Sequence, residues 1–416
     1  MKILYLNPSG QLGGAEVCLL NMMTSLLMSA PDLKLHLVAS EEGALVAKTR
    51  ALGVPVTVLP FPGVLAQLGD AGAGGPAGDQ ISRFALLRKL LSAAPHAASY
   101  RRKLRRVITD LSPDIIHTNG FKMHALAAMA RPVGTPVIWH LHDYVRPRPV
   151  MARLLRWLAP RCAVAIANSN SVAEDFRAVC GERLPVQTIY NGVDLSNFSP
   201  DGERLDLDAL SLLPPAPHGT VRVGLLATLA RWKGHETFLK AISLLPSDLP
   251  VRGYIATGAL YQTAGSQYSI NELRQLASSL GVSHRVGFTG FVSDPAAAMR
   301  SLDVVVHCST QPEPFGLVIA EALACGRAVV ASHAAGATEL IELGESALGH
   351  QPGDAETLAM NIARLVASKE LRVRLGQAGR ESALRCFDRR RLSTELISLY
   401  NGLTSPLASQ AELVTV

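Results

Sequence analysis

Two glutamates in the second half of the chain have the type and spacing to bind a sugar. Glu313 and Glu321 lie in the run 309–326, which follows an apolar segment typical of a β-strand. Gly316 favours a bare backbone near a helix start, and Gly326 favours the end of that helix. Carboxylates accept hydrogen bonds from neighbouring hydroxyls, so this pair suits a sugar and a ribose. The alternative for Glu321 is a buried structural carboxylate, which is costly when it is unpaired.

A second pair of charged residues suits a diphosphate. Arg231 and Lys233 lie in the run 228–235, between an expected strand over 221–227 and a helix. Arginine makes two parallel hydrogen bonds to a phosphate, lysine contributes a point charge, and a helix start offers backbone amides. The alternative is that both are solvated cations on a surface loop.

A glycine-rich loop follows the first expected strand, over residues 7–16. Gly13 and Gly14 allow backbone amides to approach a ligand closely, next to the partly positive end of the following helix. The spacing differs from Gly-x-Gly-x-x-Gly, which disfavours a nicotinamide or flavin enzyme. The loop taken alone also fits a plain tight turn.

The elements that must position these residues alternate between strands and helices, which predicts an α/β protein. Short apolar runs predict strands over 3–7, 35–39, 55–59, 115–117, 137–142 and 164–168, then over 221–227, 253–257, 285–288, 304–307, 328–332 and 347–350. Helical patterns between them, such as 15–29, 83–91 and 124–131, indicate parallel sheets that helices cover on both faces. Four prolines break the pattern over 197–220, as in an interdomain linker. We therefore expect two domains, 1–198 and 199–388, followed by a closing helix and tail over 389–416.

Composition narrows the class of protein. The chain has 416 residues, of which 48% are hydrophobic and 18% are charged, so a disordered chain is excluded. No run of 18 apolar residues predicts a membrane-spanning helix, and residues 1–8 fit a strand better than a signal peptide. Six cysteines without short paired spacing fit reduced thiols and a cytoplasmic location.

Two basic stretches, 101–106 and 146–161, raise the question of partners. Each fits either a solvated or packed helix, or contact with an anionic membrane surface or anionic acceptor. Nucleic acid is disfavoured because few aromatic residues lie near the run 101–106. The low-complexity segment 69–79 predicts a surface loop that could contact an acceptor.

Taken together, these motifs resemble the retaining glycosyltransferases of group one, also called glycosyltransferase family four. The resemblance covers nearly the whole chain. It rests on Gly13-Gly14-Ala15-Glu16, His142-Asp143, Asn191-Gly-Val-Asp194, Arg231-x-Lys233-Gly234, Phe288-x-Gly290-Phe291-Val292, and the two glutamates with Pro-Phe-Gly between them. It implies the GT-B fold, in which two Rossmann-like domains face a central cleft. Family members often carry Gly-Gly-x-x-Glu further on, whereas this chain has Ala335-Gly336-Ala337-Thr338-Glu339.

The resemblance also implies a role for each motif. Glu321 would accept the ribose hydroxyls of a nucleoside diphosphate sugar, and Arg231 and Lys233 would hold its diphosphate. Glu313 and the backbone amides of Phe315, Gly316 and Leu317 would hold the donor sugar and phosphate. The turn Phe291-Val292 would contact the base. His142 would approach the sugar ring, and Gly13-Gly14 would lie beneath the diphosphate. The N-terminal domain would bind the acceptor. His142 is preferred to His140 because Asp143 follows it.

The expected reaction transfers a sugar from a UDP- or GDP-linked donor to a glycan, a lipid-linked acceptor or a small molecule, as in polysaccharide biosynthesis. Cations that stabilise the leaving diphosphate are the largest expected contribution to catalysis of this reaction. No cofactor and no metal are expected, because the single Asp-x-Asp lies in the linker and His140 and His142 lack an obvious third ligand. The family implies retention of anomeric configuration, by front-face attack. Two alternatives are a nucleotide-sugar 2-epimerase-like enzyme on the same fold, which is not expected to carry both the Arg-x-Lys and the Glu-Pro-Phe-Gly motifs, and a non-catalytic sugar-binding homologue, which would lack one of the four charged residues.

Overall fold

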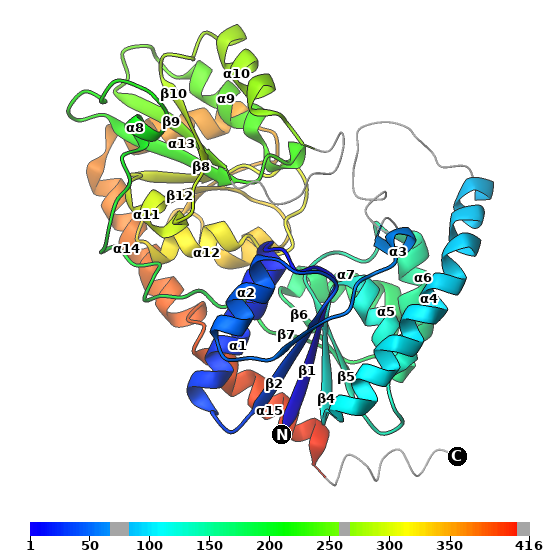
Figure 1. The fold of residues 1–416 in the computed structure, drawn as a ribbon. Coiled ribbons are helices and arrows are strands. Elements are labelled where there is room, and N and C mark those ends of the chain that lie inside the picture. The colour runs from blue at the N-terminus through cyan, green and yellow to red at the C-terminus, as the bar shows by residue number, and fades with distance from the viewer. Residues whose placement is uncertain (67–82, 258–266, 406–416) are drawn as a thin grey trace. The chain divides into compact units, whose positions relative to one another are not determined.

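The chain forms two compact units in a computed structural model that describes residues 1–66, 83–257 and 267–405. One unit comprises Met1–Gly192 with Arg389–Val416, and the other comprises Val193–Asp388. Figure 1 shows a separate sheet in each unit, with helices on both faces. Sequence analysis sets the domain boundary slightly later, between residues 198 and 199. The expected loop over 69–79 lies outside the described residues.

The N-terminal unit is built on a parallel sheet of seven strands in the order β3-β2-β1-β4-β5-β6-β7. The strands are β1 (Lys2–Asn7), β2 (Lys34–Ala39), β3 (Val56–Val58), β4 (Ile115–Asn119), β5 (Val137–Leu141), β6 (Val164–Ala167) and β7 (Val186–Thr188). Six of them are confirmed from the expected set, and β7 is new. It is an edge strand of three partly exposed residues, too short and too mixed in polarity to give a clear signal.

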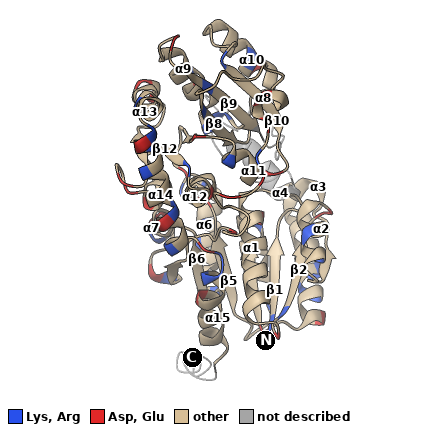
Figure 2. Ribbon diagram, turned by 90° about the vertical axis from the view of Figure 1, so that its left-hand side faces the viewer, with Lys and Arg blue, Asp and Glu red and all other residues tan. Residues whose placement is uncertain are grey.

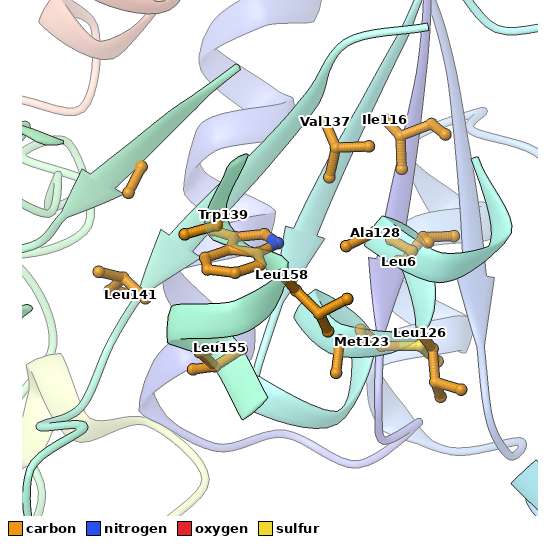
Figure 3. Close-up of a cluster of buried hydrophobic side chains, with 14 of the residues drawn as sticks. Leu6, Ile116, Met123, Leu126, Ala128, Val137, Trp139, Leu141, Leu155 and Leu158 are labelled. Carbon is orange, nitrogen blue, oxygen red and sulfur yellow. The ribbon is translucent and has the colours of Figure 1, made fainter. Parts of the chain in front are cut away.

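Two groups of helices cover this sheet. One face packs against α4 (Arg83–Leu111), α5 (Phe121–Ala130), α6 (Pro149–Leu158) and α7 (Asn170–Cys180), and Figure 3 shows Trp139 among aliphatic side chains there. The other face packs against α1 (Gly14–Ser29) and α15 (Arg391–Thr404), the expected closing helix. Short helices α2 (Ala44–Ala51), α3 (Gly63–Ala66), η1 (Ala159–Arg161) and η2 (Gly181–Arg183) complete the unit. No helix of the described residues is long and apolar enough to cross a membrane.

The C-terminal unit contains a parallel sheet of six strands in the order β10-β9-β8-β11-β12-β13. These are β8 (Val221–Ala227), β9 (Val251–Thr257), β10 (Val286–Phe291), β11 (Val304–His307), β12 (Ala328–Ser332) and β13 (Leu348–His350), which confirms all six expected segments. Its helices are α8 (Leu207–Leu210), η3 (Arg231–Lys233), α9 (His235–Leu244), α10 (Ile270–Ser279), α11 (Pro295–Arg300), α12 (Leu317–Ala324), η4 (Gly336–Leu340), α13 (Ala355–Ala367) and α14 (Lys369–Cys386). Both sheets therefore have the parallel order expected of Rossmann-like domains.

The expected linker over 197–220 is instead part of the C-terminal unit. Its helix α8 carries Asp208, which is buried and accepts hydrogen bonds from Arg252 (2.6 Å), Arg222 (3.0 Å) and the Tyr254 hydroxyl (2.6 Å). The backbone amide of Ala216 donates a further bond to it at 3.0 Å. The proline- and aspartate-rich segment 197–220 is therefore packed on the sheet through a cluster of charged residues and is not a linker.

Asp208→Ala is expected to lower the free energy of unfolding by about 3–5 kcal/mol, because the buried Arg252 guanidinium loses its carboxylate. Asp206→Ala is the control. It removes only the α8 cap at the Ala209 amide and should cost about 1 kcal/mol. Urea unfolding measures both, and equal losses would contradict the role given to the cluster.

The same cluster predicts a pH dependence. Burial alone would raise the pKa of Asp208, but Tyr254, the Ala216 amide and the two arginines hold it well below its ordinary value. The stability it contributes is therefore complete above about pH 4 and is lost as the pH falls below that value. Asp208→Asn should lose this acid dependence.

Candidate functional site

The turn that follows β8 is held against the end of β11. Arg231 and Lys233 form η3, and Gly234 ends it with a positive φ of 75°. A Cβ atom at Gly234 would lie 1.7 Å from the carbonyl oxygen of Cys308. Glycine is therefore required for the two segments to approach, and the Thr310 amide then donates to the Trp232 carbonyl at 2.7 Å.

This contact brings Lys233 to Glu313. The lysine Nζ lies 2.7 Å and 3.0 Å from the two carboxylate oxygens, and the side chains are only 19% and 12% exposed. Ser309 Oγ donates to Glu313 Oε2 at 2.8 Å, and His307 Nε2 lies 3.3 Å from the same atom. Burial would raise the pKa of Glu313, but the Lys233 charge and the His307 contact lower it well below its ordinary range. Glu313 is therefore a firmly held carboxylate.

A second loop supports Glu313 from its backbone. The Gly336 amide donates to the Glu313 carbonyl at 3.0 Å, and a Cβ atom at Gly336 would lie 2.0 Å from the Pro314 carbonyl oxygen. Ala335, where the family often has glycine, has a φ of 54°, which L-residues rarely adopt. The loop 335–336 is thus a support for the Glu313 segment.

Glu321 lies in the second turn of α12 and differs in its surroundings from Glu313. Within the part of the chain that the structure describes, no hydrogen bond or ion pair reaches its carboxyl group. Burial raises its pKa to about 8. An isolated, partly buried carboxyl group is costly, which is typical of a group kept for a ligand.

Arg231 is positioned separately from the two glutamates. Its guanidinium makes an ion pair with Glu272 at 2.8 Å and lies over the Tyr268 ring, 4.3 Å from the centroid. The side chains of Arg231 and Glu272 are 37% and 47% exposed, so the pair is weak and can exchange for another anion.

The other predicted C-terminal residues lie at the ends of β10 and at the start of α12. Phe291 ends β10 and is 67% exposed, directly before Val292. Gly316 caps α12 with a φ of 94°, and Leu317 is the first residue of that helix. Phe315 is buried and its ring packs against Phe387.

In the N-terminal unit, the glycine-rich loop leads into α1 as expected. The Gly13 amide already donates to Glu16 Oε2 at 3.0 Å, which satisfies one amide and places a carboxylate at the positive helix end. A Cβ atom at Gly14 would meet no protein atom within 4 Å, so packing within the chain does not require glycine there.

His142 follows β5 in the same unit. Its Nε2 lies 3.3 Å from Asn119 Oδ1, and its ring stacks on His140 with the centroids 4.3 Å apart. Burial lowers its pKa to about 4, which makes the imidazole neutral at pH 7. Among the described residues, no group of three or more His, Cys, Asp and Glu side chains could hold a metal ion.

Comparison with known proteins defines the class. Residues 215–382 match the family described as Glycosyl transferases group 1, and residues 43–197 match Glycosyltransferase Family 4. The chain is 31% identical over 249 residues to the lipopolysaccharide core biosynthesis mannosyltransferase LpcC of Rhizobium leguminosarum bv. viciae, covering 60% of this chain and 67% of the relative. The chain therefore belongs to the group 1 glycosyltransferase family.

Two further relatives are informative. The lipopolysaccharide core biosynthesis glycosyltransferase LpsE of Rhizobium meliloti is 31% identical over 205 residues, covering 49% of this chain and 56% of that protein. The chain spans about half the length of LpsE and of two other curated relatives that it matches. HepE of Anabaena, solved with UDP and glucose, aligns with a TM-score of 0.77 and 27% identity over 96% of this chain and 99% of that one. The fold is the GT-B architecture of two Rossmann-like domains.

The structure brings together part of the predicted set. Lys233 contacts Glu313, and Glu321 follows on the helix that the same loop begins, whereas Arg231 is held by Glu272. Gly13, Gly14 and His142 lie in the other unit. Sequence reasoning missed His307 and Ser309, although their alternation at the end of β11 and the closeness of Glu313 could have indicated a polar cluster.

Glu321→Gln is expected to change stability in a pH-dependent way. A carboxyl group whose pKa rises on folding destabilises the protein as the pH rises from 4.5 towards 8. The wild type should therefore lose up to about 1.4 kcal/mol per pH unit in this window relative to the variant. Thermal or urea unfolding at several pH values measures the difference. The exposed Glu345→Gln should show no such trend, and a parallel trend in the two variants would refute the assignment.

Proposed function

We propose that the protein is a retaining glycosyltransferase that moves a sugar from a nucleoside diphosphate sugar, UDP- or GDP-linked, to a glycan, lipid-linked or small-molecule acceptor. The observation that carries this proposal is the buried Lys233–Glu313 pair, with the unpaired Glu321 on the adjoining helix. Together they supply a cation for a phosphate and two carboxylates for hydroxyl groups. Parallel sheets bind ligands at this carboxyl edge.

The chemistry follows from where charge develops. As the anomeric carbon separates from the phosphate oxygen, negative charge accumulates on the diphosphate and positive charge on the sugar ring. Lys233 and Arg231 stabilise the diphosphate, together with the amides at the start of α12. A diphosphate replaces Glu272 as the partner of Arg231 and shares Lys233 with Glu313. Because these groups supply the positive charge, the proposed reaction needs no metal ion.

The remaining roles complete the donor site. Glu321 accepts hydrogen bonds that the ribose hydroxyls donate, and the backbone of the turn at Phe291 and Val292 contacts the base. Glu313 accepts hydrogen bonds that hydroxyls of the transferred sugar donate, and His142 approaches the sugar ring as a neutral imidazole. Attack from the face of the leaving group retains the anomeric configuration, and the leaving phosphate oxygen takes the proton of the acceptor. HepE was solved with UDP-glucose, and a relative of Mycobacterium tuberculosis that is 30% identical over 242 residues is named a GDP-mannose-dependent mannosyltransferase, so each donor class has a relative in support.

Lys233→Ala should lower turnover of the preferred nucleotide sugar by about a hundredfold to a thousandfold, the cost of removing one donor to a developing anion. The assay measures release of UDP from UDP-glucose and of GDP from GDP-mannose. Lys240→Ala is the matched control, because this lysine lies on α9 in an exposed ion pair with Glu236. Turnover of Lys233→Ala at the wild-type level would remove the lysine from the mechanism.

A membrane surface is the proposed site of a lipid-linked acceptor. Residues 101–161 hold 12 Lys and Arg against three Asp and Glu, whereas the rest of the chain holds 28 against 31. Helices α13 and α14, by contrast, carry both signs (Figure 2). The basic side chains of 101–106 are exposed on α4, as is Trp157 on α6, and Arg161 lies 4.9 Å from its ring centroid. Exposed arginines beside an exposed tryptophan favour contact with anionic lipid.

Replacing Arg102 and Arg105 with Gln should weaken binding to phosphatidylglycerol vesicles roughly 25-fold, from about 1 kcal/mol per cation. Vesicle co-sedimentation at two salt concentrations measures the effect. Arg374→Gln with Arg385→Gln on α14 is the control pair. Equal binding of wild type to neutral phosphatidylcholine vesicles would contradict the proposal.

A further inference from the structure

Four polar side chains line the carboxyl edge of the N-terminal sheet. Asn7 ends β1, Asn119 ends β4, His142 follows β5, and Asn168 follows β6. These four strands are neighbours in the sheet. We call these four residues the polar strip.

The strand register places the whole strip on one face of the sheet. Side chains alternate along a strand, and Tyr5, Ile115, Ile138 and Ile166 all belong to the core beneath α1 and α15. Each of the four strip residues lies an even number of residues beyond one of these core residues, in the same strand or directly after it. Their side chains therefore share that face. The sheet order turns back between β1 and β4, which is where open parallel sheets bind ligands.

Each member of the strip has a buried polar atom without a hydrogen-bond partner among the described residues. These atoms are Asn7 Oδ1, Asn119 Nδ2, His142 Nδ1 and Asn168 Oδ1. The three asparagines are 0%, 2% and 3% exposed. A buried polar group without a partner is costly, and these four lie on adjoining strands at the same edge of the sheet, which indicates a common cause.

The orientation of two asparagines is set by their other contacts. Asn7 Nδ2 donates to the Ser9 carbonyl at 2.7 Å and to Glu16 Oε1 at 3.2 Å, which leaves its Oδ1 as an acceptor. His142 Nε2 donates to Asn119 Oδ1, which leaves Asn119 Nδ2 as a donor and His142 Nδ1 as an acceptor. The strip therefore offers both kinds of group, and a hydroxyl both donates and accepts.

None of the four side chains of the strip is a cation that would attract a phosphate. The two oxygens of Glu16 accept bonds from Asn7 and from the Gly13 amide, and Asp143 is paired with Arg148 at 2.5 Å. Burial lowers the pKa of both His140 and His142, so neither imidazole carries a charge at pH 7.

A series of buried hydrogen bonds leads to the polar strip. The Tyr5 and Tyr400 hydroxyls are 3.1 Å apart, Tyr400 Oη lies 2.8 Å from His117 Nδ1, and His117 Nε2 lies 3.2 Å from His140 Nδ1. His140 then stacks on His142. These buried contacts hold the imidazole of His142 in one orientation, as a binding surface requires.

We propose that the polar strip binds the hydroxyl groups of an uncharged sugar or polyol. The inference rests on the proposed function for the source of that ligand, which is either the transferred sugar of the donor or the acceptor. It adds Asn7, Asn119 and Asn168 to the binding residues, beside His142.

Asn168→Leu tests the proposal in the full-length protein, since it removes the amide while keeping a side chain of similar size. Thr49→Val is the matched control, because the Thr49 hydroxyl is also buried and unpartnered but lies on α2, away from the strip. The probes are methyl α-D-glucopyranoside and methyl α-D-mannopyranoside in saturation-transfer NMR with UDP present, and UDP-glucose and UDP in calorimetry. Asn168→Ala repeats the test with a smaller side chain.

We expect Asn168→Leu to leave UDP affinity unchanged and to weaken hydroxyl recognition at least tenfold. A loss of glycoside binding identifies the acceptor as the ligand, whereas a loss of the extra affinity of UDP-glucose over UDP identifies the donor sugar. If both asparagine variants match Thr49→Val in both measurements, the strip holds water only and the proposal is wrong. Glycoside binding does not depend on turnover, so a failure of the Lys233 experiment would leave this result interpretable.

Discussion

The ion pair between Lys233 and Glu313 is the constraint on which the C-terminal site depends. The pair joins two loops separated by 80 residues, and it is largely removed from water. Removing either partner would leave the other as a buried charge without its counter-ion, so a substitution at only one of the two positions is costly. Gly234 lets these two loops approach, and Gly336 lets a third loop pack against the Glu313 segment, because a Cβ atom at either position would overlap a backbone carbonyl.

Most of the fold could be predicted because both sheets are buried on two faces. Strands of this kind are short, continuous apolar runs, and all six of the C-terminal unit are confirmed. The exceptions are physical in origin. β7 is a partly exposed edge strand, and the proline-rich segment before β8 packs through Asp208, whose partners lie on β8 and β9 and are distant in sequence.

The candidate site was only partly predictable, since spacing identifies charged residues but not their partners. Glu313, Glu321 and Lys233 stand out by motif, yet nothing local indicates that Glu272 holds Arg231 or that His307 and Ser309 hold Glu313. Asn7, Asn119 and Asn168 each resemble an ordinary strand end. Their significance depends on strand order and register, which place them side by side only after the chain has folded.

The candidate binding residues of the two units thus differ in charge. The C-terminal unit concentrates charge, with one glutamate stabilised as a carboxylate by Lys233 and another driven towards its neutral form by burial. At the N-terminal edge, the four side chains of the polar strip are neutral, because burial suppresses the charge of the histidine. A departing diphosphate needs preorganised charge, whereas a hydroxyl needs donors and acceptors without a competing ion. Because the two sets of groups lie on separate sheets, the charged residues of one unit are not among the causes of the pKa shifts in the other.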